Sequence, residues 1–140
     1  MEAVATISNA MDVGNPSNFV RILELFGNDY QKIKSFISSY RVNDITTAET
    51  IQGVFKEFNY TLDPHGAVGY NALEKYLAQH HDERGLFLET AHPLKFSDVV
   101  EKAIGKPVDI PAQLQELLKL KKQSVVVKPE YDELKSYLMG

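Results

Sequence analysis

Short, continuous apolar runs alternate along the chain with longer stretches in which apolar residues recur every three or four positions. A short apolar run bounded by glycine or polar residues predicts a β-strand that is covered on both faces. Two such runs are clear and a third is very short; they span residues 3–7, 86–88 and 60–62. The pattern therefore predicts two or three short strands.

The stretches with helical spacing predict about seven α-helices, each with an apolar stripe on one side. With their expected first residues, they cover 17–26, 29–40, 46–58, 63–79, 93–103, 111–118 and 129–138. Helices therefore outnumber strands, and the predicted fold class is a helix-rich α/β fold.

Residues that favour helix termini mark several of these boundaries. Ser17 is the expected N-cap of the first helix, and Gly27 is expected to end it. Thr46-Thr47-Ala48-Glu49 fits a capping box. Asp63 is expected to cap the fourth helix, because Pro64 suits the first helical position.

A sheet of two or three strands leaves an edge and a face uncovered. The predicted elements therefore indicate a piece of a larger α/β fold, or half of an intimate oligomer. An isolated chain of this kind exposes apolar surface, and we expect it to self-associate.

Composition excludes several classes of function. The 140 residues suggest one domain. The formal net charge is −4 and no basic patch stands out, so no nucleic-acid partner is expected. The chain has no cysteine, which excludes disulfides and thiolate metal sites. It has neither a bilayer-length apolar run nor a secretory signal, so no membrane association and a cytoplasmic location are expected.

Candidate chemistry gathers between Gly85 and Phe96. The predicted strand at 86–88 delivers Glu89, Thr90 and His92 to one turn, and Pro93 then starts a helix. Ligands of open α/β sheets bind at the carboxyl ends of strands. Thr90 and His92 would lie on one side of an extended segment, which leaves open a small hydrolase, although the chain has no Gly-x-Ser-x-Gly elbow.

The four histidines do not have metal-binding spacing. His80 and His81 are adjacent and are expected to be solvated. His65 and His92 each lie beside a proline at a predicted helix start, where bonds to the local backbone are expected. No metal site is predicted.

Three segments together resemble threonine synthases of the type found in bacteria and yeast. They are residues 8–19 (Ser-Asn-Ala-Met-Asp-Val-Gly-Asn-Pro-Ser-Asn-Phe), 63–70 (Asp-Pro-His-Gly-Ala-Val-Gly-Tyr) and 90–96 (Thr-Ala-His-Pro-Leu-Lys-Phe). Their order and spacing also match, and the resemblance covers nearly the whole chain.

The resemblance implies a fold type II pyridoxal-phosphate enzyme, similar to the tryptophan synthase β subunit, with short parallel strands. Residues 1–140 would be the C-terminal portion of its large catalytic domain. The family converts O-phospho-L-homoserine and water to L-threonine and phosphate. Its Schiff-base lysine stands in a Ser-Phe-Lys-Asp motif, which is absent from these residues, as is its Gly- and Asn-rich phosphate loop. The isolated chain is therefore expected to be inactive and to bind pyridoxal 5′-phosphate weakly or not at all.

The resemblance carries over few individual roles. Thr90 matches the family's hydroxyl residue that faces the pyridine nitrogen of the cofactor. The residues placed near the substrate side of the active site are Asn9, Asp12, Asn15, Ser17, Asn18, His65 and His92. No catalytic residue is assigned. The competing hypotheses are a non-enzymatic helical interaction module, which would be a compact monomer, and a small hydrolase that uses Thr90 and His92.

Overall fold

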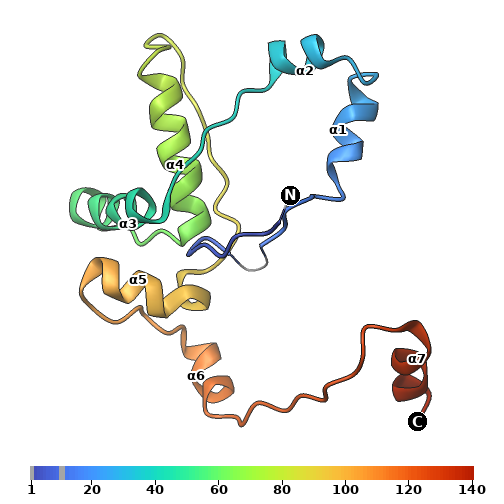
Figure 1. Cartoon of the computed structure of the whole chain (residues 1–140). Coiled ribbons are helices and arrows are strands. Elements are labelled where there is room, and N and C mark those ends of the chain that lie inside the picture. The colour runs from blue at the N-terminus through green and yellow to red at the C-terminus, as the bar shows by residue number, and fades with distance from the viewer. Residues whose placement is uncertain (1, 10–11) are drawn as a thin grey trace. The chain divides into compact units, whose positions relative to one another are not determined.

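The structure, a computed structural model, describes residues 2–9 and 12–140 (Figure 1). The chain divides into two compact units, residues 1–109 and 110–140. Within the described residues the regular elements are helices, and no strand is formed. None of these helices combines the length and the apolar character that crossing a membrane requires.

Every predicted helical stripe contains a helix. In the first unit the helices are α1 (Phe19–Leu25), α2 (Tyr30–Phe36), α3 (Asp44–Phe58), α4 (Pro64–Leu77), the 3₁₀ helix η1 (Pro93–Phe96) and α5 (Ser97–Ile104). In the second unit they are α6 (Ala112–Leu118) and α7 (Tyr131–Met139). The prediction of a helix-rich fold is therefore confirmed.

The core of the first unit lies where α3 packs against both α4 and α5 (Figure 1). Ile51 of α3, Ala67 of α4 and Val100 of α5 are fully buried there, together with Leu62 in the connection between α3 and α4. Because these side chains come from successive elements, the start of α4 is held inside the core.

The predicted helix starts are partly confirmed. Asp63 caps α4 and Pro64 opens it, as expected. The capping box at residues 46–49 is not formed, because α3 begins earlier: the Asn43 side chain accepts a hydrogen bond from Thr46 N at 2.8 Å. At α1 the N-cap is Asn18 rather than Ser17, and its side chain makes no capping bond.

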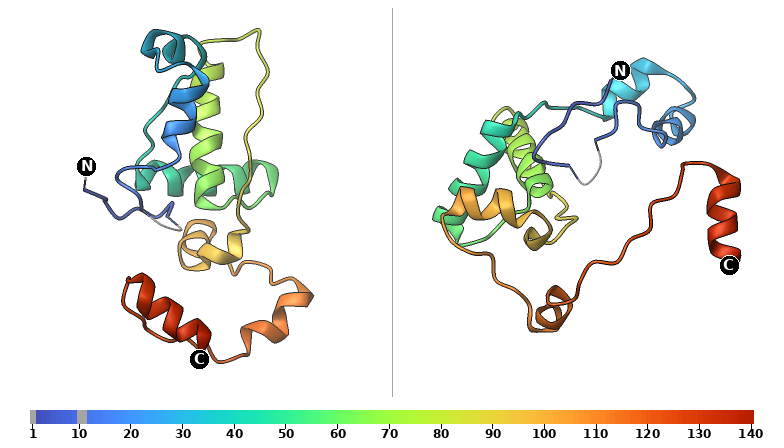
Figure 2. Two further views of the ribbon diagram at one scale, coloured as in Figure 1. Left: turned by 90° about the vertical axis from the view of Figure 1, so that its right-hand side faces the viewer. Right: turned by 60° about the horizontal axis from the view of Figure 1, so that its bottom comes forward.

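The two or three predicted strands are not confirmed. Residues 3–7, 60–62 and 86–88 do not form strands, because no described segment supplies a neighbouring backbone for a ladder. The segment at 86–88 runs beside α4 (Figure 2), with Phe87 turned toward Tyr70 at 5.7 Å between ring centroids. Leu86 and Leu88 are 96% and 81% exposed, so this run is covered on one face only.

Candidate functional site

The first turn of α4 carries a buried carboxylate. Asp63 is fully buried, and its side chain accepts hydrogen bonds from His65 N at 2.9 Å and Gly66 N at 3.4 Å. The His65 Nδ1 atom lies 2.8 Å from Asp63 Oδ1. This arrangement arises locally, since an aspartate before a proline at a helix start can satisfy the free N–H groups of the first turn.

These contacts decide the charge of Asp63. Burial by itself raises the pKa of the carboxyl group, but the hydrogen bonds from the backbone and side chain of His65 and from Gly66 outweigh it and hold the pKa below the usual value. Asp63 is therefore ionised at neutral pH.

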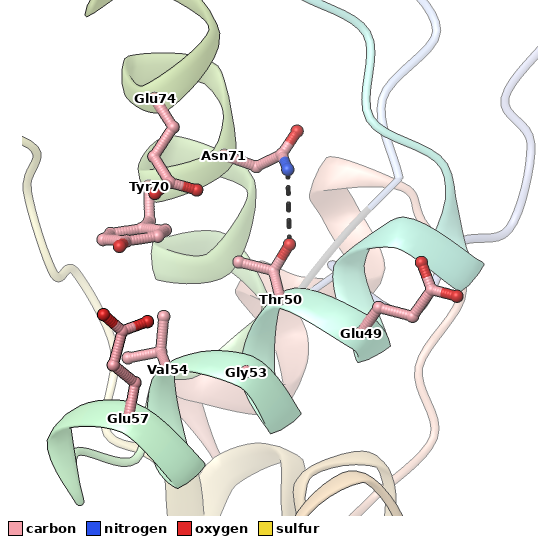
Figure 3. Close-up of a pocket in the computed structure, with 8 residues that line it drawn as sticks. All are labelled: Glu49, Thr50, Gly53, Val54, Glu57, Tyr70, Asn71 and Glu74. Atoms are coloured by element: carbon pink, nitrogen blue, oxygen red, sulfur yellow. Dashed lines mark hydrogen bonds between the residues drawn. The ribbon is translucent and has the colours of Figure 1, made fainter. Parts of the chain in front are cut away.

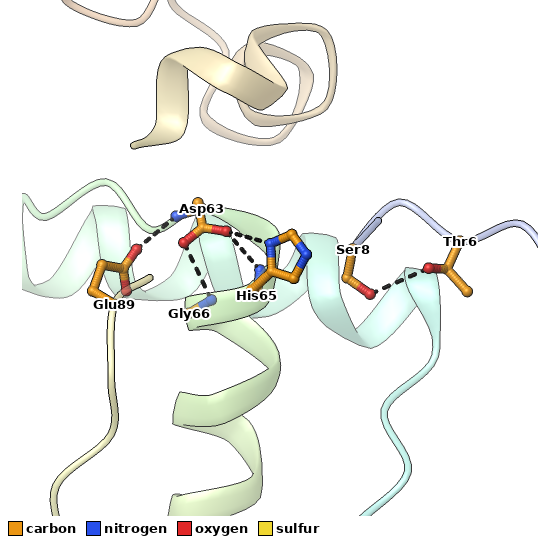
Figure 4. A network of polar contacts seen from close by, with 6 residues as sticks. All are labelled: Thr6, Ser8, Asp63, His65, Gly66 and Glu89. Atoms are coloured by element: carbon orange, nitrogen blue, oxygen red, sulfur yellow. Dashed lines mark hydrogen bonds and ion pairs between the residues drawn. The ribbon is translucent and has the colours of Figure 1, made fainter. Parts of the chain in front are cut away.

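Glu89 joins this network from the extended segment before η1 (Figure 4). Its Oε1 atom accepts a hydrogen bond from Asp63 N at 3.0 Å. Burial of its carboxyl group, together with the neighbouring Asp63 carboxylate, raises the pKa of Glu89 to about 7, against the opposing effects of the Asp63 N–H and His65. The residue as a whole remains exposed to solvent.

Thr90 follows Glu89 directly and is exposed. Within the described residues its hydroxyl group makes no hydrogen bond with the protein. His92 is also exposed, and its Nδ1 accepts a hydrogen bond from Leu94 N at 3.2 Å, which caps η1. The expectation of a local backbone bond is confirmed for His92, and in the described part of the chain no hydrogen bond joins it to Thr90.

Two other histidines differ from expectation. The His65 ring bonds to a carboxylate rather than to the local backbone, and it also packs edge-on against Phe96 at 5.0 Å. His80 is not simply solvated: its ring stacks on Tyr76 at 4.0 Å and its Nδ1 lies 2.8 Å from Tyr76 O. His81 is exposed as expected. Across residues 2–9 and 12–140, no three His, Cys, Asp or Glu side chains form a potential metal site.

The candidate residues near the N-terminus separate into two groups. Asn9 and Asp12 are hydrogen-bonded to each other, and Thr6 Oγ1 donates to Asp12 Oδ1 at 3.2 Å. A pocket of about 500 Å³ is lined by Thr6, Asn9, Lys95 and Asp98 and by the apolar side chains Ile7, Phe96 and Val99. Asn15, Ser17 and Asn18 are exposed and remain outside both the pocket and the Asp63 network.

A second pocket, of about 310 Å³, lies between α3 and α4 (Figure 3). Its walls are Glu49, Thr50, Gly53, Val54, Glu57, Tyr70, Asn71 and Glu74. No predicted site residue lines it. Because its charged side chains are all carboxylates, it is unsuited to an anion such as a phosphate group.

Sequence reasoning placed Glu89 at the turn but did not recognise it as a functional partner of Asp63. The contact joins residues 26 positions apart, so no local pattern reveals it. The one related feature of the sequence is the glycine at position 66. Its missing side chain leaves the space beside the first turn of α4 that the Glu89 carboxyl group occupies.

Comparison with known proteins places these features in a family context. The family described as "Threonine synthase, C-terminal" matches residues 66–138, more than half of the chain. Threonine synthase of Buchnera aphidicola from Acyrthosiphon pisum is 39% identical over 99% of the chain, and that of Escherichia coli is 40% identical over 97%. In both cases the chain spans 31% of the relative's length.

Solved structures show the same correspondence. The crystal structure of Escherichia coli threonine synthase superposes with a TM-score of 0.85 at 39% identity, covering 99% of this chain and 32% of that one. Threonine synthase from Brucella melitensis, whose structure is described as bound to PLP, superposes with a TM-score of 0.72 at 29% identity, covering 99% of this chain and 34% of that one.

Proposed function

The chain belongs to the threonine synthase C-terminal family, and on this premise we propose that it supplies the C-terminal third of a pyridoxal-phosphate threonine synthase. The complete enzyme would convert O-phospho-L-homoserine and water to L-threonine and phosphate. The observation that carries the proposal is the similarity of 99% of the chain, in sequence and in backbone, to about a third of threonine synthases.

The side chains present fit one part of a pyridoxal-phosphate site. Thr90 offers an exposed hydroxyl group that makes no bond with described residues, so it is available to the ring nitrogen. When bound, the cofactor supplies an electron sink for carbanion chemistry. A neutral hydroxyl at the ring nitrogen leaves that nitrogen less basic than a carboxylate would. The cofactor-binding lysine would come from a part of the enzyme that these residues do not contain.

We place the substrate on the side of the pocket that Asn9 and Lys95 line. Asn9 offers an amide that is bonded to Asp12, and Lys95 and Asp98 offer one charge of each sign, which suits an amino-acid substrate with both anionic and ammonium groups. Asn15, Ser17, Asn18, His65 and His92 are also assigned to this side of the complete active site, on the family resemblance.

The same proposal accounts for the absent strands. Residues 1–140 would form the C-terminal portion of the large catalytic domain, in which 3–7 and 86–88 pair with parallel strands from the rest of the enzyme. The exposure of Leu86 and Leu88 supports this placement, since a strand between covering helices buries both of its faces.

A chimeric enzyme tests the proposal. The last third of Escherichia coli threonine synthase is replaced by this chain, and formation of threonine and phosphate is measured. We expect activity, and we expect Thr90→Ala to lower kcat about fivefold to thirtyfold, the effect of losing roughly 1–2 kcal/mol of hydrogen bonding. Thr90→Ser, which keeps the hydroxyl, should retain most activity.

The outcomes of this test separate two claims. A folded chimera that binds the cofactor but forms no threonine would contradict the proposed function. Turnover that Thr90→Ala leaves unchanged would contradict the role of Thr90 alone.

A further inference from the structure

Glu89, the residue directly before Thr90, is hydrogen-bonded to Asp63, the N-cap residue of α4. Its Oε1 atom accepts the Asp63 N–H at 3.0 Å, across 26 positions of sequence. Asp63 is itself fully buried and caps α4, so the carboxyl group of Glu89 is anchored to a rigid point of the core.

Gly66 leaves the space in which this carboxyl group lies. A Cβ atom at position 66 would overlap the carboxyl group of Glu89, including both oxygen atoms. Gly66 is in the first turn of α4 and its φ is not in the left-handed region, so backbone conformation does not require glycine here. The Glu89 carboxyl group fills the space that a side chain at position 66 would take, and as the end of a flexible side chain it is the group that an added Cβ would displace.

Aromatic contacts hold the segment on both sides of this bond. Before it, Phe87 packs against Tyr70 at 5.7 Å. After it, Phe96 packs against His65 at 5.0 Å. Between these contacts the described structure provides one hydrogen bond from residues 88–91 to the N-cap residue of α4, and Glu89 makes it.

We propose that Glu89 is a positioning residue, whose carboxyl group holds the backbone of Thr90 in a fixed place relative to α4. The relevance of this placement to catalysis rests on the proposed function, because Thr90 is the residue assigned to the cofactor. The placement itself is a property of this chain.

The protonation state of Glu89 sets the strength of this contact. The ionisable groups that face it are Asp63 and His65, both at the start of α4. A neutral Glu89 can accept the Asp63 N–H with one oxygen and donate its proton toward the Asp63 carboxylate with the other. An ionised Glu89 can only accept, and it then faces a second negative charge. The Asp63 N–H alone favours the ionised form, but burial and the Asp63 carboxylate outweigh it, so the neutral form, which can make both hydrogen bonds, predominates below pH 7.

NMR on the 140-residue chain tests the placement without the cofactor. Glu89→Ala should speed hydrogen exchange of the Asp63 amide by about fivefold to thirtyfold and increase the mobility of the Thr90 amide. Glu89→Gln can make both hydrogen bonds of the neutral acid, so it should preserve protection and make it insensitive to pH between 6 and 8, a range of about one unit around the pKa.

Glu101 provides a matched control. Its Oε1 accepts a hydrogen bond from Val108 N at 3.0 Å, which is the same kind of carboxylate–backbone contact at another place in the first unit. Glu101→Ala should release the Val108 amide and leave Thr90 unchanged. Equal loosening of Thr90 by Glu101→Ala and Glu89→Ala would overturn the proposal, because it would show general destabilisation.

Gly66→Ala gives a second test that keeps Glu89. The added methyl group should displace the Glu89 carboxyl group and loosen Thr90 as Glu89→Ala does. In the Glu89→Ala background the same substitution should leave Thr90 unchanged, since the displaced group is already gone. Thr90 dynamics that Gly66→Ala alone does not alter would contradict the proposed contact.

The chimeric enzyme connects the placement to the site. Both Glu89→Gln and Glu89→Ala remove the titrating carboxyl group, so each should flatten the pH dependence of the visible absorption of bound cofactor. Glu89→Ala, which also loses the contact with Asp63, should in addition shift the absorption itself. If the unsubstituted chimera binds no cofactor, the proposed function fails while the NMR results still decide the placement. If it binds cofactor and Glu89→Ala leaves the spectrum unchanged at every pH, the positioning role in the site is wrong.

Discussion

At the residue scale, two neighbouring acids respond to pH in opposite directions. The pKa of Asp63 is held below its usual value, so its contribution to stability is present above the unfolded pKa and is lost as pH falls through the folded pKa. The pKa of Glu89 is raised from 4.5 to about 7. Folding is therefore accompanied by proton uptake at Glu89 between these two values, and its contribution declines as pH rises from 4.5 to 7.

Urea unfolding of the chain at several pH values measures this decline. We expect the Glu89 contribution to lower the free energy of unfolding as pH rises from 4.5 toward 7. Glu89→Gln should reduce this slope because an amide does not titrate, whereas Glu101→Gln should keep it. A Glu89→Gln variant with the wild-type slope would show that another group takes up the proton.

At the element scale, the start of α3 is set by Asn43 rather than by the threonines. Asn43 has the extended backbone of an N-cap and accepts the Thr46 N–H at 2.8 Å. Thr47 lies inside the helix and donates its hydroxyl to Asn43 O at 2.9 Å. The helix therefore begins directly after Asn43, a residue that is not part of the capping-box pattern at 46–49.

Substitution at the two candidate caps distinguishes them. Asn43→Ala should cost about 1 kcal/mol of stability, the usual effect of losing an N-cap. Thr46→Ala keeps the backbone N–H that Asn43 accepts, so its cost should be smaller. Urea unfolding of both variants provides the comparison, and a larger cost for Thr46→Ala would restore the capping-box interpretation.

What could be predicted from sequence depended on the range of the interactions. Apolar spacing located every helix, and Asp63-Pro64 located the start of α4, because these signals lie within a few residues of their effect. The strands could not be predicted from local sequence alone, since a strand forms only beside a partner backbone. The Glu89–Asp63 contact was missed for the same reason: each residue has an ordinary local setting, and the core between α3, α4 and α5 brings them together.

At the scale of the whole molecule, the segment at 86–88 has one face packed against α4 and one open face, which is exposed to solvent. Phe87 packs against Tyr70 of α4, whereas Leu86 and Leu88 are 96% and 81% exposed. Exposed leucines on an unpaired extended segment favour association with another apolar surface or strand edge. In the complete enzyme we assign that surface to the remainder of the catalytic domain.

Substitution of the two exposed leucines should therefore change the association of the chain with other surfaces rather than the stability of the isolated chain. Leu86→Ser with Leu88→Ser should leave the urea midpoint of the 140-residue chain nearly unchanged and reduce its self-association in sedimentation velocity. In the chimeric enzyme the same pair should cost roughly 1.5–3 kcal/mol of stability per leucine, since each side chain would then be buried. Phe87→Ala is the contrasting control, because loss of its contact with Tyr70 should destabilise the chain and the chimera alike. A chimera that tolerates both serines without loss of stability would mean that this face remains open in the complete enzyme, and the strand assignment at 86–88 would then be wrong.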